Sequence, residues 1–219
     1  GKAEIRVGDI TQKGSVESII EQIYNENKRL DIVVNNAGTY KPVTLDDDFS
    51  KVEEMINLDM MAPYRISFSL VKKFQNLNQK LKILTVASQA SIKVFPEGLG
   101  YGVAKTALVS GLLHLERELK ERGDNITFYR IYPGTVATEK MIPLIEEGKL
   151  QNPISLESVV NTALDLLSEK TPSRDVYIGY SPQNGIERVY LEYVEENGFN
   201  TIKVKDVDII DNSFNPSKL

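Results

Sequence analysis

Short apolar runs alternate with segments of helical periodicity along most of this chain, and this order restricts the folds open to it. The runs at residues 30–34, 81–87 and 126–132 are mostly apolar, with one or two polar residues in each, which is typical of buried strands. Residues 16–24 and 156–167 instead repeat apolar side chains at helical spacing. Such alternation is typical of α/β proteins. The sequence therefore predicts a parallel sheet with helices on both faces.

Both ends of the chain extend this pattern. We predict a first strand at residues 3–7 and a last parallel strand at residues 175–180. Beyond it, residues 186–196 have the spacing of a helix, whereas residues 201–210 alternate like a strand. The segment at 139–154 mixes apolar and charged residues with two prolines and a glycine, which fits either a surface loop or a mobile lid.

One long helix is predicted at residues 50–76, with Pro63 inside it. Proline has no backbone N–H, so the carbonyl of Asp59 loses its partner and the helix should kink close to Asn57. Three serines stand where helices should begin and are predicted N-caps: Ser15, Ser50 and Ser155.

The composition excludes several classes of function. The length of 219 residues suits a single domain, which we place at 1–219 with a core at 1–182 and an extension at 183–219. A net charge of −5 without a basic stripe argues against nucleic acid as a partner, and no apolar run is long enough for a membrane span. The chain has no cysteine and one histidine, His114, so we expect no disulfide, no metal site and a cytoplasmic location.

Three residues indicate proton-transfer chemistry. Lys105 follows Tyr101 by four residues, so both side chains lie on one face of a predicted helix. Ser88 lies at the end of the predicted strand thirteen residues before Tyr101. A phenol is a weak acid, and a nearby ammonium favours its phenolate form. A tyrosine and a lysine at this spacing are also common on ordinary helix surfaces, so the prediction depends on further motifs.

Those motifs are present, in order. They are Asp9-Ile10, Asn35-Asn36-Ala37-Gly38, Asn57, and Pro133-Gly134 followed by Thr138. Together with Ser88, Tyr101 and Lys105 they make the chain resemble the short-chain dehydrogenase/reductase family, from about residue 3 to about residue 180. The resemblance implies a Rossmann-like, doubly wound fold and an NAD- or NADP-dependent oxidoreductase.

The resemblance also implies a role for each motif residue. Tyr101 would give a proton to, or take one from, the oxygen of a carbonyl/alcohol substrate, and Ser88 would orient that oxygen. Lys105 would hold the nicotinamide ribose and favour the Tyr101 phenolate, while Asn57 would hold a water through its backbone. The implied cofactor contacts are Asp9, Ile10, Asn36, Ala37, Gly38, Tyr101, Lys105, Pro133, Gly134, Val136 and Thr138. The implied substrate contacts are Ser88, Gln89, Val94, Tyr101 and Met141.

The sequence departs from the family pattern at the turn that binds the cofactor pyrophosphate. The family opens with a strand and a TGxxxGxG turn, where the pyrophosphate lies at a helix N-terminus. This sequence has no such turn, begins with Gly1 and enters at once what resembles the third strand. We therefore expect either a longer natural chain, which the missing initiator methionine favours, or a protein that has lost its dinucleotide site.

Three functions stay open. The first is a reductase or dehydrogenase acting on a small-molecule carbonyl/alcohol pair, working as a homodimer or homotetramer as the family does. The second is a sugar-nucleotide epimerase or dehydratase, which also uses Ser, Tyr and Lys. The third is a non-catalytic cofactor-sensing or scaffold protein, which the missing glycine-rich turn would explain. Asn57 and the Asn-Asn-Ala-Gly segment favour the first.

Overall fold

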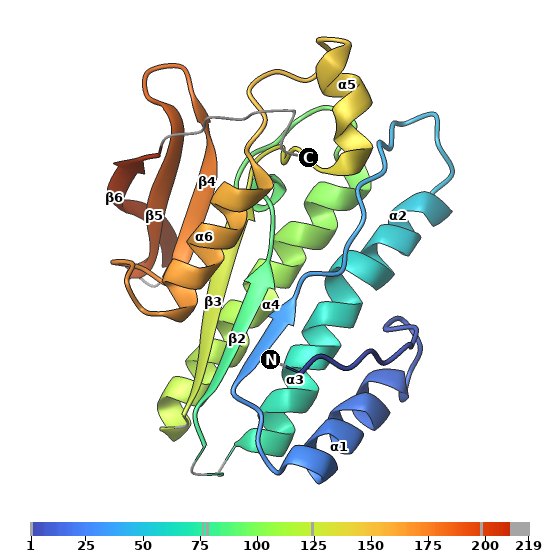
Figure 1. Cartoon of the computed structure of the whole chain (residues 1–219), viewed down its shortest axis with the longest axis vertical. Helices are drawn as coiled ribbons and strands as arrows, with labels where there is room; N and C mark the ends of the chain where they lie inside the picture. The colour runs from blue at the N-terminus through green and yellow to red at the C-terminus, as the bar shows by residue number, and fades with distance from the viewer. Residues whose placement is uncertain (1, 76, 78, 124, 198, 211–219) are drawn as a thin grey trace. The chain divides into compact units, whose positions relative to one another are not determined.

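The computed structural model describes residues 2–75, 77, 79–123, 125–197 and 199–210 (Figure 1). The chain divides into two compact units, and each is described by itself. The first comprises Gly1–Thr85 and Ala90–Phe128, and the second comprises Val86–Gln89 and Tyr129–Leu219. The single domain at 1–219 stays a prediction.

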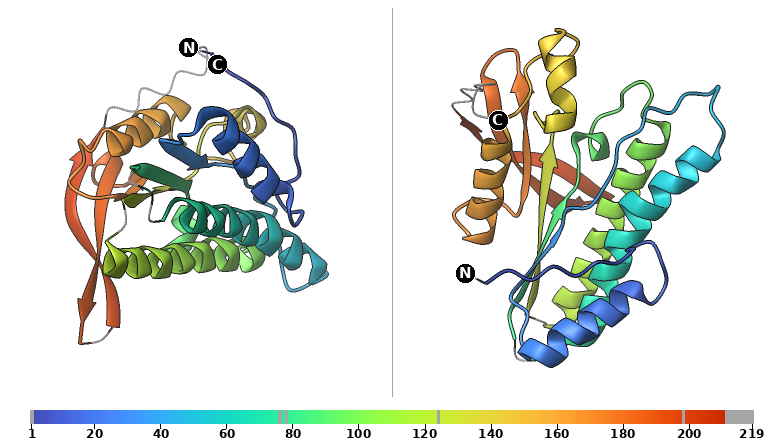
Figure 2. Two further views of the ribbon diagram at one scale, coloured as in Figure 1. Left: turned by 90° about the horizontal axis from the view of Figure 1, so that it is seen from below. Right: turned by 45° about the vertical axis from the view of Figure 1, so that its right-hand side comes forward.

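The first unit alternates helices and strands as expected. Parallel pairing joins β1 to β2, with Asn35 opposite Thr85. The helix α3 lies beside both α1 and α4 (Figures 1 and 2). The elements are α1 (Ser15–Asn27), β1 (Ile32–Asn35), α2 (Ser50–Met55), the π-helix η1 (Ile56–Met61), α3 (Ala62–Phe74), β2 (Leu81–Val86) and α4 (Leu99–Arg122).

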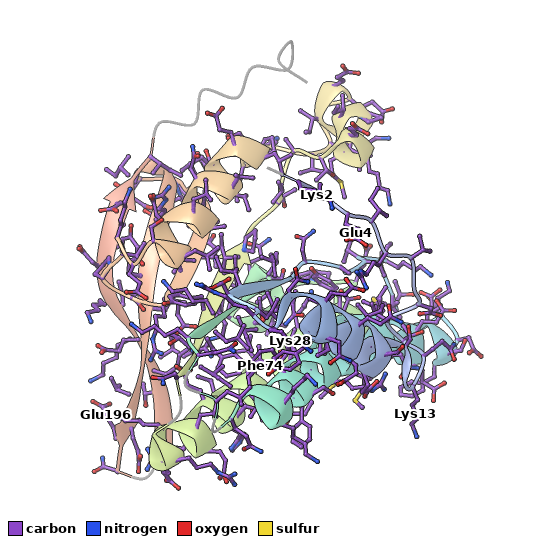
Figure 3. All side chains as sticks on the ribbon, turned by 60° about the horizontal axis from the view of Figure 1, so that its bottom comes forward. Lys2, Glu4, Lys13, Lys28, Phe74 and Glu196 are labelled. Atoms are coloured by element: carbon purple, nitrogen blue, oxygen red, sulfur yellow. The ribbon has the colours of Figure 1, made fainter. Side chains whose placement is uncertain are left out.

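The core of this unit lies between the helices and the strands. Phe74 is 1% exposed and packs edge-on against Tyr24, with ring centroids 5.4 Å apart (Figure 3). Small residues let the helices approach closely: a Cβ built at Gly111 of α4 would lie 2.8 Å from the ring of Tyr64 on α3. Other core side chains are Val16, Ile20, Leu70, Leu81, Ile83, Leu108, Leu112 and Phe128.

The second unit combines parallel and antiparallel pairing. Parallel pairing joins β3 to β4, and antiparallel pairing joins β4 to β5 and β5 to β6. The α/β class is confirmed, and the sheet is mostly parallel and flanked by helices. The elements are η2 (Gln89–Ser91), β3 (Ile126–Pro133), η3 (Glu139–Met141), α5 (Ile142–Glu146), α6 (Leu156–Leu167), β4 (Asp175–Ser181), β5 (Gly185–Glu196) and β6 (Phe199–Ile209).

A buried ion pair crosses from β3 to β4. The Nε and Nη2 atoms of Arg130 donate to the two carboxylate oxygens of Asp175 at 2.5 and 2.8 Å. The hydroxyl of Tyr132 donates to the same carboxylate at 2.8 Å and lies 3.0 Å from the hydroxyl of Tyr193. Arg130 is 2% exposed and Asp175 is 5% exposed, so the pair is enclosed by protein.

Two predicted elements are wrong. Residues 3–7 form no strand, and Ile5 and Val7 are 90% and 96% exposed, because no described strand pairs with this segment. The predicted helix at 186–196 is the strand β5. Its apolar residues at 186, 190 and 193 mimic helical spacing, but its valines and tyrosines favour strands, and it pairs on both edges. The strand predicted at 201–210 is confirmed as β6.

The predicted helix starts are confirmed in one case of three. Ser155 caps α6, and its Oγ accepts the backbone N–H of Ser158 at 3.1 Å. At α1 the N-cap is Gly14, whose φ of 82° favours glycine, and at α2 it is Phe49. In both cases the predicted serine is the first helical residue instead.

The predicted distortion near Asn57 is confirmed and takes the form of a π-helix. The N–H of Ala62 donates to the carbonyl of Asn57, five residues earlier. Because Pro63 cannot donate to the carbonyl of Asp59, the hydrogen-bond register changes here between α2 and α3. No helix among the described residues combines the length and apolar character of a membrane span.

Candidate active site

The helix α4 brings Tyr101 and Lys105 together, as the spacing predicts. The Nζ of Lys105 lies 5.5 Å from the centre of the Tyr101 ring. Lys105 is only 4% exposed, whereas Tyr101 is partly exposed. The ring therefore reaches the surface while the ammonium lies beneath it.

An acidic residue that the sequence reasoning missed accompanies this lysine. Asp59 of η1 is fully buried, and its Oδ1 lies 3.3 Å from the Nζ of Lys105. The backbone N–H of Thr39 donates to the same carboxylate at 3.0 Å. A single aspartate in the apolar stretch around Asn57 was the available signal. A buried charge needs a partner of opposite sign, and the Asp59 carboxylate and the Lys105 ammonium are such partners for each other.

Burial and charge act in opposite directions on this pair. Burial lowers the pKa of Lys105, and the carboxylate of Asp59 opposes that shift. Burial raises the pKa of Asp59, against the opposing effects of Lys105 and of the Thr39 N–H. Each charge therefore depends on the other, and a change at Asp59 should be felt at the ammonium.

Gly38 makes room for the pair. A Cβ built at this residue would lie 2.5 Å from the Oδ1 of Asp59 and 3.3 Å from the Nζ of Lys105. Asn36 and Ala37 lie in the same segment after β1. Asn35, which ends β1, donates its side-chain amide to the hydroxyls of Ser67 and Thr85 at 3.1 and 3.4 Å, so this segment is anchored to α3 and β2.

An aromatic cluster surrounds Tyr101. Its ring stands nearly perpendicular to that of Tyr40, at 77° and 5.4 Å between centroids. The ring of Phe95 lies 6.4 Å beyond Tyr40. Burial and the charge of Glu97 raise the pKa of Tyr40, so its hydroxyl stays protonated. Tyr40 was not among the predicted cofactor or substrate contacts.

The other predicted residues of the first unit make contacts of their own. Asp9 accepts the N–H and the hydroxyl of Thr11 at 2.9 and 2.6 Å, and these bonds lower its pKa. Ile10 packs against the core of the unit. Val94 is wholly exposed. The backbone of Asn57 accepts the Ala62 N–H inside η1.

The remaining predicted residues belong to the second unit. Ser88 lies two residues after the end of β2 and is 8% exposed. After β3, the N–H of Gly134 donates to Ile178 at 2.8 Å, and a Cβ built at Gly134 would lie 3.5 Å from the Oε1 of Gln89. Pro133 ends β3, Val136 bridges to Ile154, Thr138 donates its N–H to the Val136 carbonyl at 2.9 Å, and Met141 ends η3.

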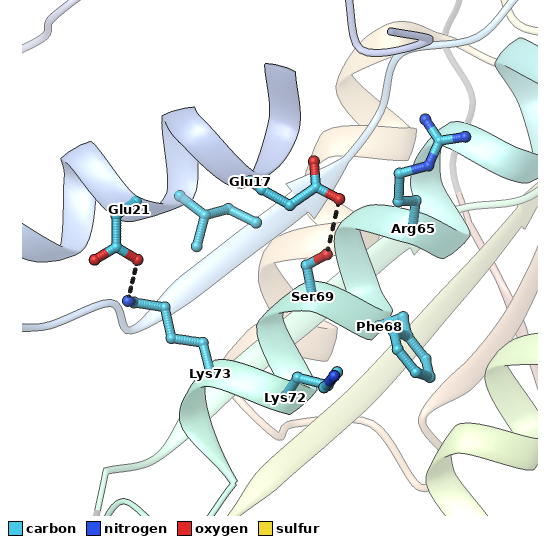
Figure 4. Close-up of a pocket in the computed structure, with 8 residues that line it drawn as sticks. Glu17, Glu21, Arg65, Phe68, Ser69, Lys72 and Lys73 are labelled. Carbon is cyan, nitrogen blue, oxygen red and sulfur yellow. Dashed lines mark hydrogen bonds and ion pairs between the residues drawn. The ribbon is translucent and has the colours of Figure 1, made fainter. Parts of the chain in front are cut away.

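A hollow of about 480 Å³ between α1 and α3 contains none of the predicted residues (Figure 4). Its polar side chains contact one another: Lys73 pairs with Glu21, and the hydroxyl of Ser69 donates to Glu17 at 3.5 Å. The hollow is open to solvent, and its described lining offers no buried acid or base, in contrast to the buried Lys105 and Asp59.

The dependence of Lys105 on Asp59 can be measured directly. Asp59→Asn keeps the size and an acceptor for the Thr39 N–H but removes the charge that raises the pKa of Lys105. We expect the pKa of Lys105 to fall further, by roughly 1 to 3 pH units. Titration of ¹³Cε-labelled lysine by NMR gives this pKa, and the signal that is missing in Lys105→Met identifies Lys105.

The matched control is Asp31→Asn, because Asp31 is exposed and pairs with Arg29 at the surface. It should leave the titration of Lys105 unchanged. An equal or higher Lys105 pKa in folded Asp59→Asn would contradict the predicted coupling.

Comparison with known proteins gives relatives of one kind. The model of the short chain dehydrogenase family matches residues 1–148. The uncharacterized oxidoreductase YvrD of Bacillus subtilis is 30% identical over 145 residues, which cover 63% of this chain and 51% of that protein. The 3-oxoacyl-[acyl-carrier-protein] reductase FabG of Haemophilus influenzae is 28% identical, covering 64% and 57%. The matches thus span little more than half the length of these relatives.

Solved structures show the same fold. A 7α-hydroxysteroid dehydrogenase complexed with NADH and 7-oxo glycochenodeoxycholic acid matches with a TM-score of 0.65 and 24% identity, over 76% of this chain and 69% of that one. A 4-hydroxyisoleucine dehydrogenase complexed with NADH matches with a TM-score of 0.64 and 20% identity, over 77% and 75%. At these identities the likeness is one of fold, and it is Rossmann-like.

Proposed function

Because the chain belongs to the short chain dehydrogenase family, we propose that the protein is an NAD(P)-dependent oxidoreductase acting on a small-molecule carbonyl/alcohol pair. The observation that carries this proposal is the ammonium of Lys105, buried beneath the ring of Tyr101 and held by Asp59. A buried cation beside a partly exposed phenol is suited to moving a proton at the phenol oxygen.

The residues near Lys105 fit the nicotinamide end of a dinucleotide. Lys105 offers ammonium donors, and the segment at Asn36, Ala37 and Gly38 is kept open by a glycine that tolerates no side chain. When bound, the nicotinamide would supply or accept the hydride. We propose that Lys105 holds the adjacent ribose, and that Asp9, Ile10, Pro133, Gly134, Val136 and Thr138 form the rest of the cofactor contacts.

The proton is the part of the reaction that the protein's own residues handle. In reduction, Tyr101 gives its hydroxyl proton to the developing alkoxide, and in oxidation its phenolate takes the proton back. Lys105 favours the phenolate through its charge, and Asp59 keeps Lys105 in place and charged. Tyr40 packs against the Tyr101 ring and Phe95 against Tyr40, so the phenol has aromatic neighbours on that side.

The remaining roles follow the family pattern. We propose that Ser88 donates a hydrogen bond to the substrate oxygen and that the backbone of Asn57 holds a water near Lys105. Gln89, Val94 and Met141 are proposed substrate contacts, and their mixed character suits an apolar or mixed substrate. The cytoplasmic location and the homo-oligomeric state stay predictions.

Transfer of a labelled hydride tests this function. The protein, with any residues that its gene encodes before Gly1, is incubated with NADH or NADPH carrying deuterium at C4 and with aldehydes and ketones of increasing size. We expect deuterium on the carbinol carbon of at least one product, detected by mass spectrometry. Dinucleotide binding without transfer to any carbonyl would contradict the proposal and favour a cofactor-sensing protein.

A further inference from the structure

The last strand, β6, presents one edge without a partner among the described residues. It closes the strand order of the second unit and pairs only with β5 (Figure 1). Eleven residues, Phe199–Ile209, belong to it. The N–H and C=O groups along the outer edge of such a strand can pair with another strand.

A β-bulge gives this strand one apolar face. Val204 lies opposite Leu191 and Asp206 opposite Tyr190, so Lys205 is an extra residue that resets the alternation of side chains. The four apolar residues between positions 202 and 209 therefore share a face, since their partners on β5 are all odd-numbered. They are Ile202, Val204, Val207 and Ile209, which are 44%, 62%, 41% and 67% exposed.

Two copies of the β6 sequence that run in opposite directions place complementary residues opposite each other. Residues 202–209 read Ile-Lys-Val-Lys-Asp-Val-Asp-Ile. About the midpoint between Lys205 and Asp206, every lysine mirrors an aspartate and every apolar residue mirrors an apolar one. The mirrored pairs are Ile202 with Ile209, Lys203 with Asp208, Val204 with Val207 and Lys205 with Asp206.

Because of the bulge, two antiparallel copies of β6 can pair with their mirrored residues opposite each other and on the same face. Two antiparallel strands related by a two-fold axis through the sheet place residue 202 of one opposite residue 209 of the other, on the same face. In a regular strand, residues seven apart lie on opposite faces. The extra residue at Lys205 reverses the second half of β6, so both residues of each apolar mirrored pair lie on one face.

We propose that β6 is a self-association edge, on which β6 of a second copy of this chain pairs antiparallel about the midpoint between Lys205 and Asp206. Main-chain hydrogen bonds would join the strands. The apolar stripe of one copy would continue into that of the other, and each lysine would face an aspartate. Lys203 and Lys205 now contact Glu196 and Glu192 of β5 at the surface, where they stay accessible to a second strand.

Charge reversal on one half of the strand tests the pairing. In the double variant Lys203→Asp with Lys205→Asp, aspartates face aspartates across the axis. In Asp206→Lys with Asp208→Lys, lysines face lysines. We expect each variant to raise the dissociation constant of this contact by roughly 100-fold. Sedimentation equilibrium of the whole protein measures it, and circular dichroism shows whether each variant is folded.

Mixing the two variants provides the decisive control. In a mixed pair, every aspartate of the first variant faces a lysine of the second, so the equimolar mixture should regain the wild-type assembly. A chain carrying all four changes should self-associate like the wild type. A wild-type protein that does not associate through this strand, or two folded variants whose mixture fails to assemble, would overturn the proposal.

Discussion

Tyr101→Phe is expected to lower kcat by about 10²–10⁴-fold while leaving the fold intact, since it removes the group that exchanges a proton with the substrate. The ring stays, and with it the edge-on contact to Tyr40 and the cover over Lys105. Only the hydroxyl is lost, so the effect should appear mainly in kcat. Steady-state kinetics on the carbonyl that accepts the labelled hydride measures the loss.

Tyr40→Phe is the matched control, because it removes a hydroxyl from the neighbouring ring and keeps the aromatic packing. It should leave kcat within a few-fold of wild type. If Tyr101→Phe were equally mild, Tyr101 would not be the proton donor.

Asp175→Ala is expected to have the largest effect on stability. Arg130 would remain buried without the carboxylate that accepts two of its hydrogen bonds, and Tyr132 would lose the same acceptor. Breaking a buried pair by removing one partner costs about 3–5 kcal/mol. Urea unfolding should show a loss of this size in the free energy of unfolding, and the protein could be unfolded at 37 °C.

The comparison variant is Asp165→Ala, which breaks the pair that Asp165 forms with Arg188 at 2.8 Å. The side chain of Arg188, which this change leaves in place, is 12% exposed, against 2% for that of Arg130, so water reaches it more readily. We expect a cost of about 1 kcal/mol or less. Equal losses in the two variants would show that enclosure of the β3–β4 pair contributes nothing.

The prediction from sequence succeeded for helices and strands whose structure is determined by their own residues and not by pairing with a neighbour. Strands β1 to β4 are stretches rich in apolar residues, and α6 follows a serine that caps it. The prediction failed for β5, where the apolar spacing fits a helix and only pairing with β4 and β6 decides for a strand. It failed also for residues 3–7, where apolar alternation without a paired neighbour gives no strand.

The candidate site likewise has a part that the sequence predicted and a part that it did not. The fixed spacing of Tyr101 and Lys105 on one helix made their proximity predictable. Asp59 is far from Lys105 in sequence and meets it only because η1 and α4 pack together. The space constraint at Gly38 depends on that same contact. Such long-range contacts have no signature in a single sequence.

The π-helix η1 has a consequence for how this region can vary. A π-helical segment accommodates one more residue than an α-helix does over the same turns, and one residue corresponds to about 100° of rotation. Deleting a single residue from η1 would let α2 and α3 join as one regular helix. Because the residue removed is the extra one held by the π turns, the side chains of α2 and α3 would keep their directions, and the change would fall on η1 itself, the segment from which Asp59 faces Lys105. The π turns therefore determine where the carboxylate of Asp59 lies without changing the packing of the helices on either side.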